Sequence, residues 1–255
     1  MNVAHGRAAP EQPPHGSSTE SRLIAHRLGA GWGPENSLQA FSAARRAGLR
    51  AFECDVKLSS DGVAFLLHDD DLARTAGLAG RGSALPWRAL RRWQPSLQDL
   101  ADACAGDAIE LNLEIKPDSD ACCALQADWG ARIAAAAARL WADAPRAPLL
   151  SSFSPAALQG AALAAPRLPR AWLCCALPPN WRGTAQALGV EGIHLDARCA
   201  GTDQIDAAHA QRLRVRLYTV NDGEQAARWL AAGVDALFTD CLAGVPSPVS
   251  EKSPR

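Results

Sequence analysis

The sequence lacks any strong excess of charge: 26 Lys and Arg residues stand against 27 Asp and Glu, for a formal net charge of -1. A balanced charge gives no global field that would attract nucleic acid or an acidic membrane, although a local basic site for a small anion remains compatible with it. No apolar run reaches the roughly 18 residues needed to cross a bilayer. We therefore expect no nucleic-acid partner and no stable association with a membrane.

The N-terminus lacks the apolar segment of a secretory signal, because residues 1–20 are polar and contain Pro10, Pro13 and Pro14. The C-terminal residues are rich in Pro and Ser. Segments of this composition bury too little apolar surface to fold. We expect disordered tails at residues 1–20 and 243–255, and one domain at residues 21–242.

The 8 cysteines lack the spacing of a zinc ribbon. Two adjacent pairs, Cys122–Cys123 and Cys174–Cys175, also make a poor disulfide framework, since neighbouring cysteines rarely bridge each other. This pattern indicates a reducing compartment in which cysteine fills small apolar gaps. We expect a cytoplasmic protein.

Short apolar runs alternate with Ala-, Leu- and Arg-rich stretches of helical spacing, for example at residues 128–143, 204–213 and 223–232. Such repeated alternation predicts a parallel sheet, and eight units in about 220 residues predict closure into a TIM (β/α)8 barrel. The expected strands are Leu23–His26, Ala51–Leu58, Glu110–Lys116, Leu149–Phe153, Ala171–Ala176, Gly192–Asp196, Arg214–Val220 and Ala236–Thr239.

One further strand-like run, Val63–His68, follows the second strand after only four residues, Ser59–Gly62. A parallel crossover needs a dozen or more residues, so this run must form an antiparallel hairpin with the strand before it. We therefore expect an insertion at about residues 59–95 that contains one extra hairpin strand.

Acidic residues gather where the second and third barrel strands end. Glu53 and Asp55 are two residues apart on a strand, so both side chains point to one face. Glu114 on a neighbouring strand is placed to join them. Such a set of oxygen ligands suits Mg²⁺ or Ca²⁺, and the alternative is a set of salt bridges at the barrel mouth.

Arg27 and Lys116 bring two cations to the same mouth, where they would bind a phosphate or, alternatively, neutralise the acids. His26 and His68 close two strands nearby and are candidate proton carriers. In a barrel of this kind, the chemistry lies at the carboxyl ends of the strands.

The sequence resembles the glycerophosphodiester phosphodiesterase family over about residues 22 to 241. The motifs that carry the resemblance are His26-Arg27-Leu28-Gly29, Pro34-Glu35-Asn36-Ser37, Glu53-Cys54-Asp55-Val56, Asp61-Gly62 with His68-Asp69, Leu72 with Arg74-Thr75, Leu111 to Lys116, Ser151-Ser152-Phe153, Tyr218 to Asn221, and Thr239-Asp240. The combination is highly specific, although no single motif is.

The resemblance implies a TIM barrel of the PLC-like phosphodiesterase type, with a small insertion after the second strand. It also implies roles for the residues at the barrel mouth. Glu53, Asp55 and Glu114 would hold the divalent ion, His26 and His68 would be the acid–base pair, Arg27 and Lys116 would bind the phosphate, and Glu35 would join the metal ligands or contact the glycerol.

Two positions depart from the family pattern. Leu28 stands where the family usually has Gly, which predicts a reshaped loop. Tyr218 stands where the family commonly has Trp, and it would form part of the pocket wall. Neither departure removes a metal ligand or a catalytic histidine.

The function expected from these residues is metal-dependent hydrolysis of a small-molecule glycerophosphodiester to sn-glycerol 3-phosphate and an alcohol. Two alternatives remain open: the same fold acting on a lysophospholipid or another phosphodiester, and an inactive barrel that binds phosphoesters. The sequence leaves the head group, the physiological metal and the oligomeric state undecided.

Overall fold

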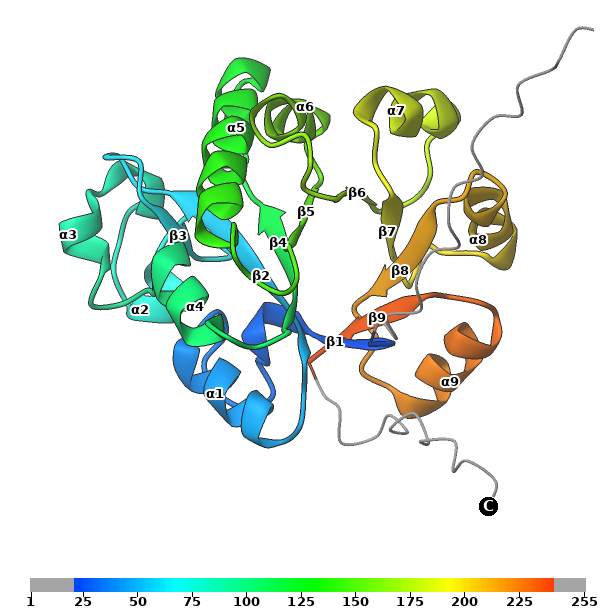
Figure 1. The fold of residues 1–255 in the computed structure, drawn as a ribbon, viewed down its shortest axis with the longest axis horizontal. Helices are drawn as coiled ribbons and strands as arrows, with labels where there is room; N and C mark the ends of the chain where they lie inside the picture. The colour runs from blue at the N-terminus through cyan, green and yellow to red at the C-terminus, as the bar shows by residue number, and fades with distance from the viewer. Residues whose placement is uncertain (1–20, 241–255) are drawn as a thin grey trace, which may run out of the picture.

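A computed structural model describes residues 21–240, and the tails expected at both ends lie outside this range. Eight parallel strands form a closed ring in the order β1-β9-β8-β7-β6-β5-β4-β2, because β1 pairs with both β9 and β2 (Figure 1). The predicted TIM barrel is thereby confirmed. The strands are β1 (Leu23–Ala25), β2 (Ala51–Leu58), β4 (Glu110–Ile115), β5 (Leu149–Ser152), β6 (Arg170–Cys174), β7 (Gly192–Asp196), β8 (Arg214–Tyr218) and β9 (Ala236–Thr239).

Helices connect successive strands and cover the outside of the barrel (Figure 1). Local sequence signals start several of them: the Ser37 and Ser154 side chains accept hydrogen bonds from the first turn of their helices, and Ser96 forms a capping box with Asp99. The helices are α1 (Leu38–Arg46), α4 (Leu97–Cys104), α5 (Cys123–Leu140), α6 (Pro155–Ala164), α7 (Trp181–Leu188), α8 (Thr202–His209) and α9 (Gly223–Ala231).

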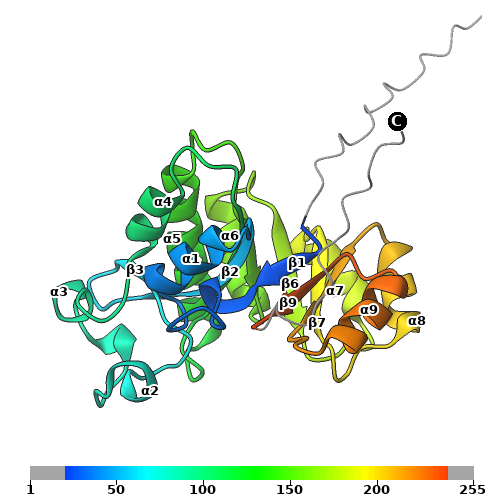
Figure 2. The same ribbon diagram turned by 90° about the horizontal axis from the view of Figure 1, so that it is seen from below.

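The extra strand β3 (Ala64–Leu66) pairs antiparallel with β2, as the short connection between them predicted. The chain then forms α2 (Ala73–Ala76), the 3-10 turn η2 (Gly82–Ala84) and α3 (Trp87–Leu90) before it returns to the barrel at α4. This insertion projects on the side of the barrel away from α8 and α9 (Figures 1 and 2). It packs around its own small apolar cluster.

Strand β2 is buried along its whole length, because one face lines the barrel interior and the other packs under helices. Phe52, Cys54 and Val56 belong to the apolar cluster between the strands and the helices. The alternate residues of β2 therefore point into the barrel, where Glu53 and Asp55 lie almost completely buried. This alternation places acidic side chains in a low-dielectric interior.

Helices α5 and α6 cross with their backbones in close contact. A Cβ atom on Gly130 would lie 1.9 Å from the carbonyl oxygen of Ala157, and one on Gly160 would lie 2.0 Å from that of Ala127. Because Gly130 and Gly160 have no side chains, the backbones of the two helices can approach each other this closely while the helices cover β4 and β5. Within residues 21–240, none of the helices combines the length and the apolar character that a membrane span requires.

Candidate active site

Three carboxylates from the neighbouring strands β2 and β4 meet inside the barrel. Glu53 and Asp55 share the inner face of β2, and the strand register pairs Asp55 with Glu114 of β4. One oxygen of each residue lies within 4.8 Å of an oxygen of the other two, and all three side chains are buried. The group predicted from the sequence is therefore brought together.

The charges of these carboxylates are only partly balanced by the protein. Burial and the neighbouring charge of Asp55 raise the pKa of Glu53, and burial likewise raises the pKa of Glu114. Burial opposes ionisation of Asp55 too, but Lys116 and other cations lower its pKa. The Oε1 atom of Glu53 is buried without a hydrogen-bond partner. A buried, unpaired carboxylate oxygen beside two more carboxylates fits a divalent cation that prefers oxygen ligands.

Two cations lie against this acidic group. The Nζ atom of Lys116 is 3.0 Å from Oε1 of Glu114 and 3.3 Å from Oδ1 of Asp55. The guanidinium of Arg27 donates to Oε2 of Glu35 at 2.9 Å, and its Nε is buried without a hydrogen-bond acceptor. Although burial opposes their charge, the surrounding acids raise the pKa of both cations. Both stay protonated and can bind an anion.

His26 follows β1 in the short 3-10 turn η1 (His26–Leu28) and is held by an acid that directly follows the last strand. Its Nδ1 lies 2.7 Å from Oδ1 of Asp240, and its Nε2 lies 3.8 Å from Oε2 of Glu53. Asn221 donates to the second oxygen of Asp240 at 3.1 Å. Burial opposes protonation of His26, but the hydrogen bond to Asp240 and the charge of Glu53 raise its pKa.

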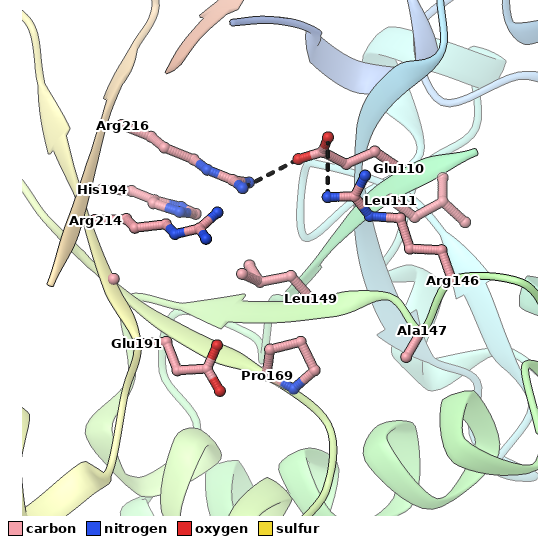
Figure 3. Close-up of a pocket in the computed structure, with 11 residues that line it drawn as sticks. Glu110, Leu111, Arg146, Ala147, Leu149, Pro169, Glu191, His194, Arg214 and Arg216 are labelled. Carbon is pink, nitrogen blue, oxygen red and sulfur yellow. Dashed lines mark hydrogen bonds and ion pairs between the residues drawn. The ribbon is translucent and has the colours of Figure 1, made fainter. Parts of the chain in front are cut away.

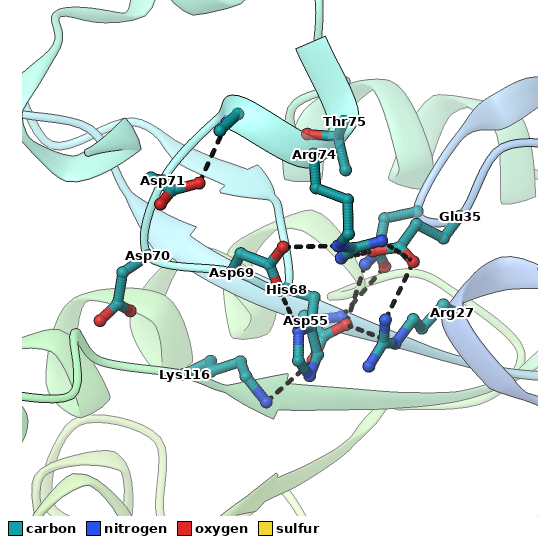
Figure 4. Close-up of polar contacts among 12 residues, drawn as sticks. Arg27, Glu35, Asp55, His68, Asp69, Asp70, Asp71, Arg74, Thr75 and Lys116 are labelled. Atoms are coloured by element: carbon teal, nitrogen blue, oxygen red, sulfur yellow. Dashed lines mark hydrogen bonds and ion pairs between the residues drawn. The ribbon is translucent and has the colours of Figure 1, made fainter. Parts of the chain in front are cut away.

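His68 follows β3, on the insertion, and also has an acid partner (Figure 4). Its Nδ1 lies 2.7 Å from Oδ1 of Asp69, whose other oxygen accepts a 2.7 Å hydrogen bond from Arg74. Burial, aided by the charge of Lys116, lowers the pKa of His68 despite the nearby carboxylates. The two histidines thus have matching Asp partners but opposite electrostatic environments.

Both histidines line one cavity of about 200 Å³. Arg27, Lys116 and the carboxylates of Glu53 and Glu114 line it as well. Its apolar wall includes Tyr218, whose hydroxyl donates to the carbonyl of Cys174 at 3.0 Å, and Phe153, whose ring meets that of Tyr218 edge-on. A second hollow of about 370 Å³ adjoins this cavity and shares Glu114, Lys116 and Phe153 with it.

Glu35 lies outside the trio of carboxylates. Its two oxygens accept hydrogen bonds from Arg74 at 2.6 and 2.7 Å, and one of them also accepts from Arg27. Its expected contact with metal or glycerol stays a prediction.

The sequence alone predicted no role for four further residues, although all lie in the motifs of the resemblance: Asp69, Arg74, Asn221 and Asp240. Two signals in the sequence could have found the acids: Asp69 lies directly beside His68, and Asp240 directly follows the last strand.

The loop after β1 has an unusual backbone. Arg27 and Leu28 adopt φ values of 50° and 60°, in the left-handed region where glycine is most at ease. Leu28 stands where the family usually has Gly, and its side chain is fully buried beside Phe41 and Ala44. Left-handed backbone costs roughly 1–2 kcal/mol for such a residue. Burying a leucine contributes about 1.5–3 kcal/mol, which offsets that cost.

A separate cavity of about 220 Å³ lies at the opposite, amino-terminal end of the strands (Figure 3). Glu110 at its edge forms ion pairs with Arg216 at 3.1 Å and with Arg146 at 3.3 Å. His194 also lines this cavity and packs against the ring of Phe238. His194 is therefore a packed residue of the barrel interior and does not line the cavity of the two catalytic candidates.

Comparisons with known proteins agree with this geometry. The family model described as "Glycerophosphoryl diester phosphodiesterase family" matches residues 26–243. A solved Oleispira antarctica phosphodiesterase, in complex with the product sn-glycerol-3-phosphate, is 28% identical, with a TM-score of 0.77 over 86% of this chain and 92% of that one.

Two curated relatives carry similar names. A glycerophosphodiester phosphodiesterase of Bacillus altitudinis is 24% identical over 86% of this chain and 94% of its own length. A Mycobacterium tuberculosis protein named "Probable glycerophosphodiester phosphodiesterase 2" is 40% identical over 93 residues, and this match spans 34% of each chain. With the family model matching most of its length, the chain belongs to the glycerophosphoryl diester phosphodiesterase family.

Proposed function

We propose that this protein hydrolyses glycerophosphodiesters to sn-glycerol 3-phosphate and an alcohol at the cavity lined by His26 and His68. The observation that carries the proposal is that two Asp-paired histidines and two cations line one small cavity, together with two members of a group of three buried carboxylates. The product named for the Oleispira antarctica relative supports the substrate class.

Glu53, Asp55 and Glu114 would hold a divalent cation, Mg²⁺ or Ca²⁺. The bound ion would supply Lewis-acid polarisation of a phosphoryl oxygen and offset the charge that develops there. The Oε1 atom of Glu53 is buried without a hydrogen-bond partner, and a bound ion would give this atom a partner. This supports the role of Glu53 as a ligand.

The remaining residues would bind the phosphate and move protons. Arg27 and Lys116 hold the phosphate oxygens by charge-assisted hydrogen bonds. One histidine takes the proton from the attacking hydroxyl as its oxygen forms a bond to phosphorus. This hydroxyl belongs to water or to the glycerol of the substrate, and in the second case the product is a cyclic phosphate that water opens to sn-glycerol 3-phosphate in a further step. As the scissile P–O bond breaks, the other histidine gives a proton to the oxygen of the leaving alcohol. Phe153 and Tyr218 form an apolar wall for the organic part of the substrate.

The test is release of sn-glycerol 3-phosphate from glycerophosphocholine by the purified protein with Mg²⁺, with Ca²⁺ and with EDTA. We expect turnover with at least one ion and none with EDTA. The variants His26→Ala and Glu53→Ala should each lose activity by orders of magnitude while remaining folded. Absence of turnover with every metal, or near-normal rates in both variants, would overturn the proposal.

The same assay addresses the two alternatives. Faster turnover of lysophosphatidylcholine would move the substrate class to lysophospholipids. Binding of sn-glycerol 3-phosphate without turnover of any diester would identify an inactive phosphoester-binding barrel. The cytoplasmic location expected from the cysteine pattern stays a prediction, to be checked by cell fractionation.

A further inference from the structure

Arg74 bridges two parts of the site that come from different segments of the chain (Figure 4). Its Nε donates to Oδ2 of Asp69 at 2.7 Å, and its two terminal nitrogens donate to the two oxygens of Glu35 at 2.7 and 2.6 Å. Asp69 belongs to the insertion, whereas Glu35 belongs to the loop between β1 and α1. Glu35 is 39 residues from Arg74 in sequence. One guanidinium therefore joins the insertion to the first loop of the barrel.

On the insertion side, this bridge reaches His68. Hydrogen bonds to Arg74 and to His68 lower the pKa of Asp69 to about 2, so its carboxylate is ionised and can only accept hydrogen bonds. Nδ1 of His68, at 2.7 Å from Asp69, must then carry the proton. In the neutral ring this leaves Nε2 as the free lone pair, the form needed to accept a proton in the cavity.

On the barrel side, the bridge reaches Arg27. Glu35 accepts from Arg27 at 2.9 Å with the same oxygen that accepts from Arg74 at 2.7 Å. The planar fork of the Arg74 guanidinium fixes the carboxylate of Glu35 through two hydrogen bonds. Glu35 in turn fixes the guanidinium of Arg27, whose backbone is already held by a hydrogen bond to Glu53. The orientation of the phosphate-binding cation thus depends on the same bridge.

We propose that Arg74 is a positioning residue that sets the orientation of His68 through Asp69 and of Arg27 through Glu35, so that the insertion completes the site. This inference rests on the proposed function only where it is tested by kcat, because that test requires turnover. Arg74 does not line the cavity and touches no reacting atom, so its effect would pass entirely through its two carboxylate partners.

A purely structural role fits the surroundings of Arg74 poorly. Half of its side chain is exposed, and exposed ion pairs contribute little to stability. The insertion has its own apolar cluster, which includes the fully buried Leu72 directly before α2, so its packing does not depend on Arg74. The three short hydrogen bonds of Arg74 are therefore better explained by the geometry that they impose on their partners.

The experiment compares Arg74→Gln and Arg74→Lys with a matched control, Arg81→Gln. Arg81 belongs to the same insertion, its side chain is 44% exposed, and it donates to Asp120 at 2.6 Å away from the cavity. We expect Arg74→Gln to lower kcat for glycerophosphocholine at least about tenfold, because small displacements of catalytic groups are costly. Arg74→Lys should recover part of this loss, and Arg81→Gln should stay within about twofold of the parent protein. Equal kcat values for Arg74→Gln and Arg81→Gln would overturn the proposal.

A second measurement does not depend on turnover. The ¹⁵N chemical shifts of the His68 ring, assigned with a His68→Gln variant, report which ring nitrogen carries the proton. The parent protein should show the proton on Nδ1, and Arg74→Gln should shift the population toward Nε2, with guanidinium ions added in solution partly reversing the shift. A His68 tautomer that is the same in both proteins would reject the positioning role. If the parent protein lacks turnover but the tautomer shift occurs, only the proposed function fails.

Discussion

The Nδ1 atom of His26 lies 2.7 Å from Oδ1 of Asp240, although the two residues are 214 positions apart in sequence. Closure of the barrel explains the contact, because β1 pairs with β9 and each residue directly follows its strand. Since an ionised carboxylate accepts but cannot donate, Asp240 keeps the His26 proton on Nδ1 and directs Nε2 toward Glu53.

Replacing Asp240 by Asn should impair catalysis without unfolding the protein. The amide can donate to Nδ1 and so favour the opposite tautomer, and a comparable change in the Ser-His-Asp triad is very costly, so we expect kcat to fall by about 10²-fold or more. Loss of the carboxylate also lowers the pKa of His26, because Asp240 is one of the groups that raise it. The corresponding inflection in a pH profile of kcat/KM should move to lower pH.

A matched control is Asp235→Asn. Asp235 lies 2.9 Å from Nε2 of His209, a His–Asp pair outside the cavity. The kcat of the Asp235→Asn variant should match that of the parent protein within about twofold. A similar loss in both variants would show that the effect of Asp240 is not specific to the active site.

Metal-free protein should become less stable as the pH rises from about 5 to 8. Burial and the charge of Asp55 raise the pKa of Glu53 from 4.5 to about 8. Between these values the folded protein keeps a proton that the unfolded chain has lost, so the free energy of unfolding falls with pH, by at most about 1.4 kcal/mol per unit for one proton. Thermal unfolding in EDTA at several pH values measures this slope, and Glu53→Gln should flatten it.

A divalent ion should oppose that loss. Binding to ionised carboxylates releases the proton held by Glu53, so Mg²⁺ or Ca²⁺ should raise Tm more at pH 8 than at pH 5.5. Calorimetry in two buffers of different ionisation enthalpy would detect the released proton near pH 7. An equal rise in Tm at both pH values would contradict the assignment of Glu53 as a ligand.

Lys57 should be important for stability rather than for catalysis. Its side chain is fully buried on β2, with Nζ 2.8 Å from Asp70 and 3.2 Å from Asp118. Lys57→Met leaves both carboxylates without this partner, and breaking a buried ion pair costs about 3–5 kcal/mol. Urea unfolding should show a loss near the lower end of that range, since Asp70 is partly exposed. Adding Asp118→Asn to the variant should recover part of the loss.

The contact between α5 and α6 gives a paired test of packing. Gly130→Ala would place a Cβ 1.9 Å from the carbonyl oxygen of Ala157, so we expect a loss of about 1–3 kcal/mol of stability. Gly183→Ala on α7 meets no atom within 4 Å and should instead stabilise by about 0.5–1 kcal/mol, because alanine favours a helix more than glycine does. Chemical denaturation of both variants checks the opposite signs.

Features that depend on local periodicity were predictable from the sequence. The alternation on β2 predicted that Glu53 and Asp55 share a face, and the four-residue connection predicted that β3 is antiparallel to β2, both as found. The third ligand candidate, Glu114, follows from the order of the strands, since parallel pairing of β2 with β4 sets it opposite Asp55.

Features that depend on long-range closure were not predictable in the same way. The contact of Arg74 with Glu35 depends on how the insertion folds back over the first loop, and no local pattern encodes that path. Helix α5 was expected at residues 128–143 but begins at Cys123, because the residue before it, Cys122, provides no side-chain cap that would mark the start. The left-handed backbone of Leu28 could not be predicted either. Leucine in place of glycine predicted that the loop is reshaped, but not which backbone angles Leu28 adopts.

The pairing of β1 with β9 also has a consequence for protein synthesis. His26 leaves the ribosome early and Asp240 among the last described residues, so a nascent chain holds an unpartnered histidine until β9 closes the ring. Catalytic competence would therefore arise in one step, at the end of folding. A chain interrupted between residues 116 and 240 would carry all of the side chains proposed to bind the metal and the phosphate, and yet lack the acid that holds His26.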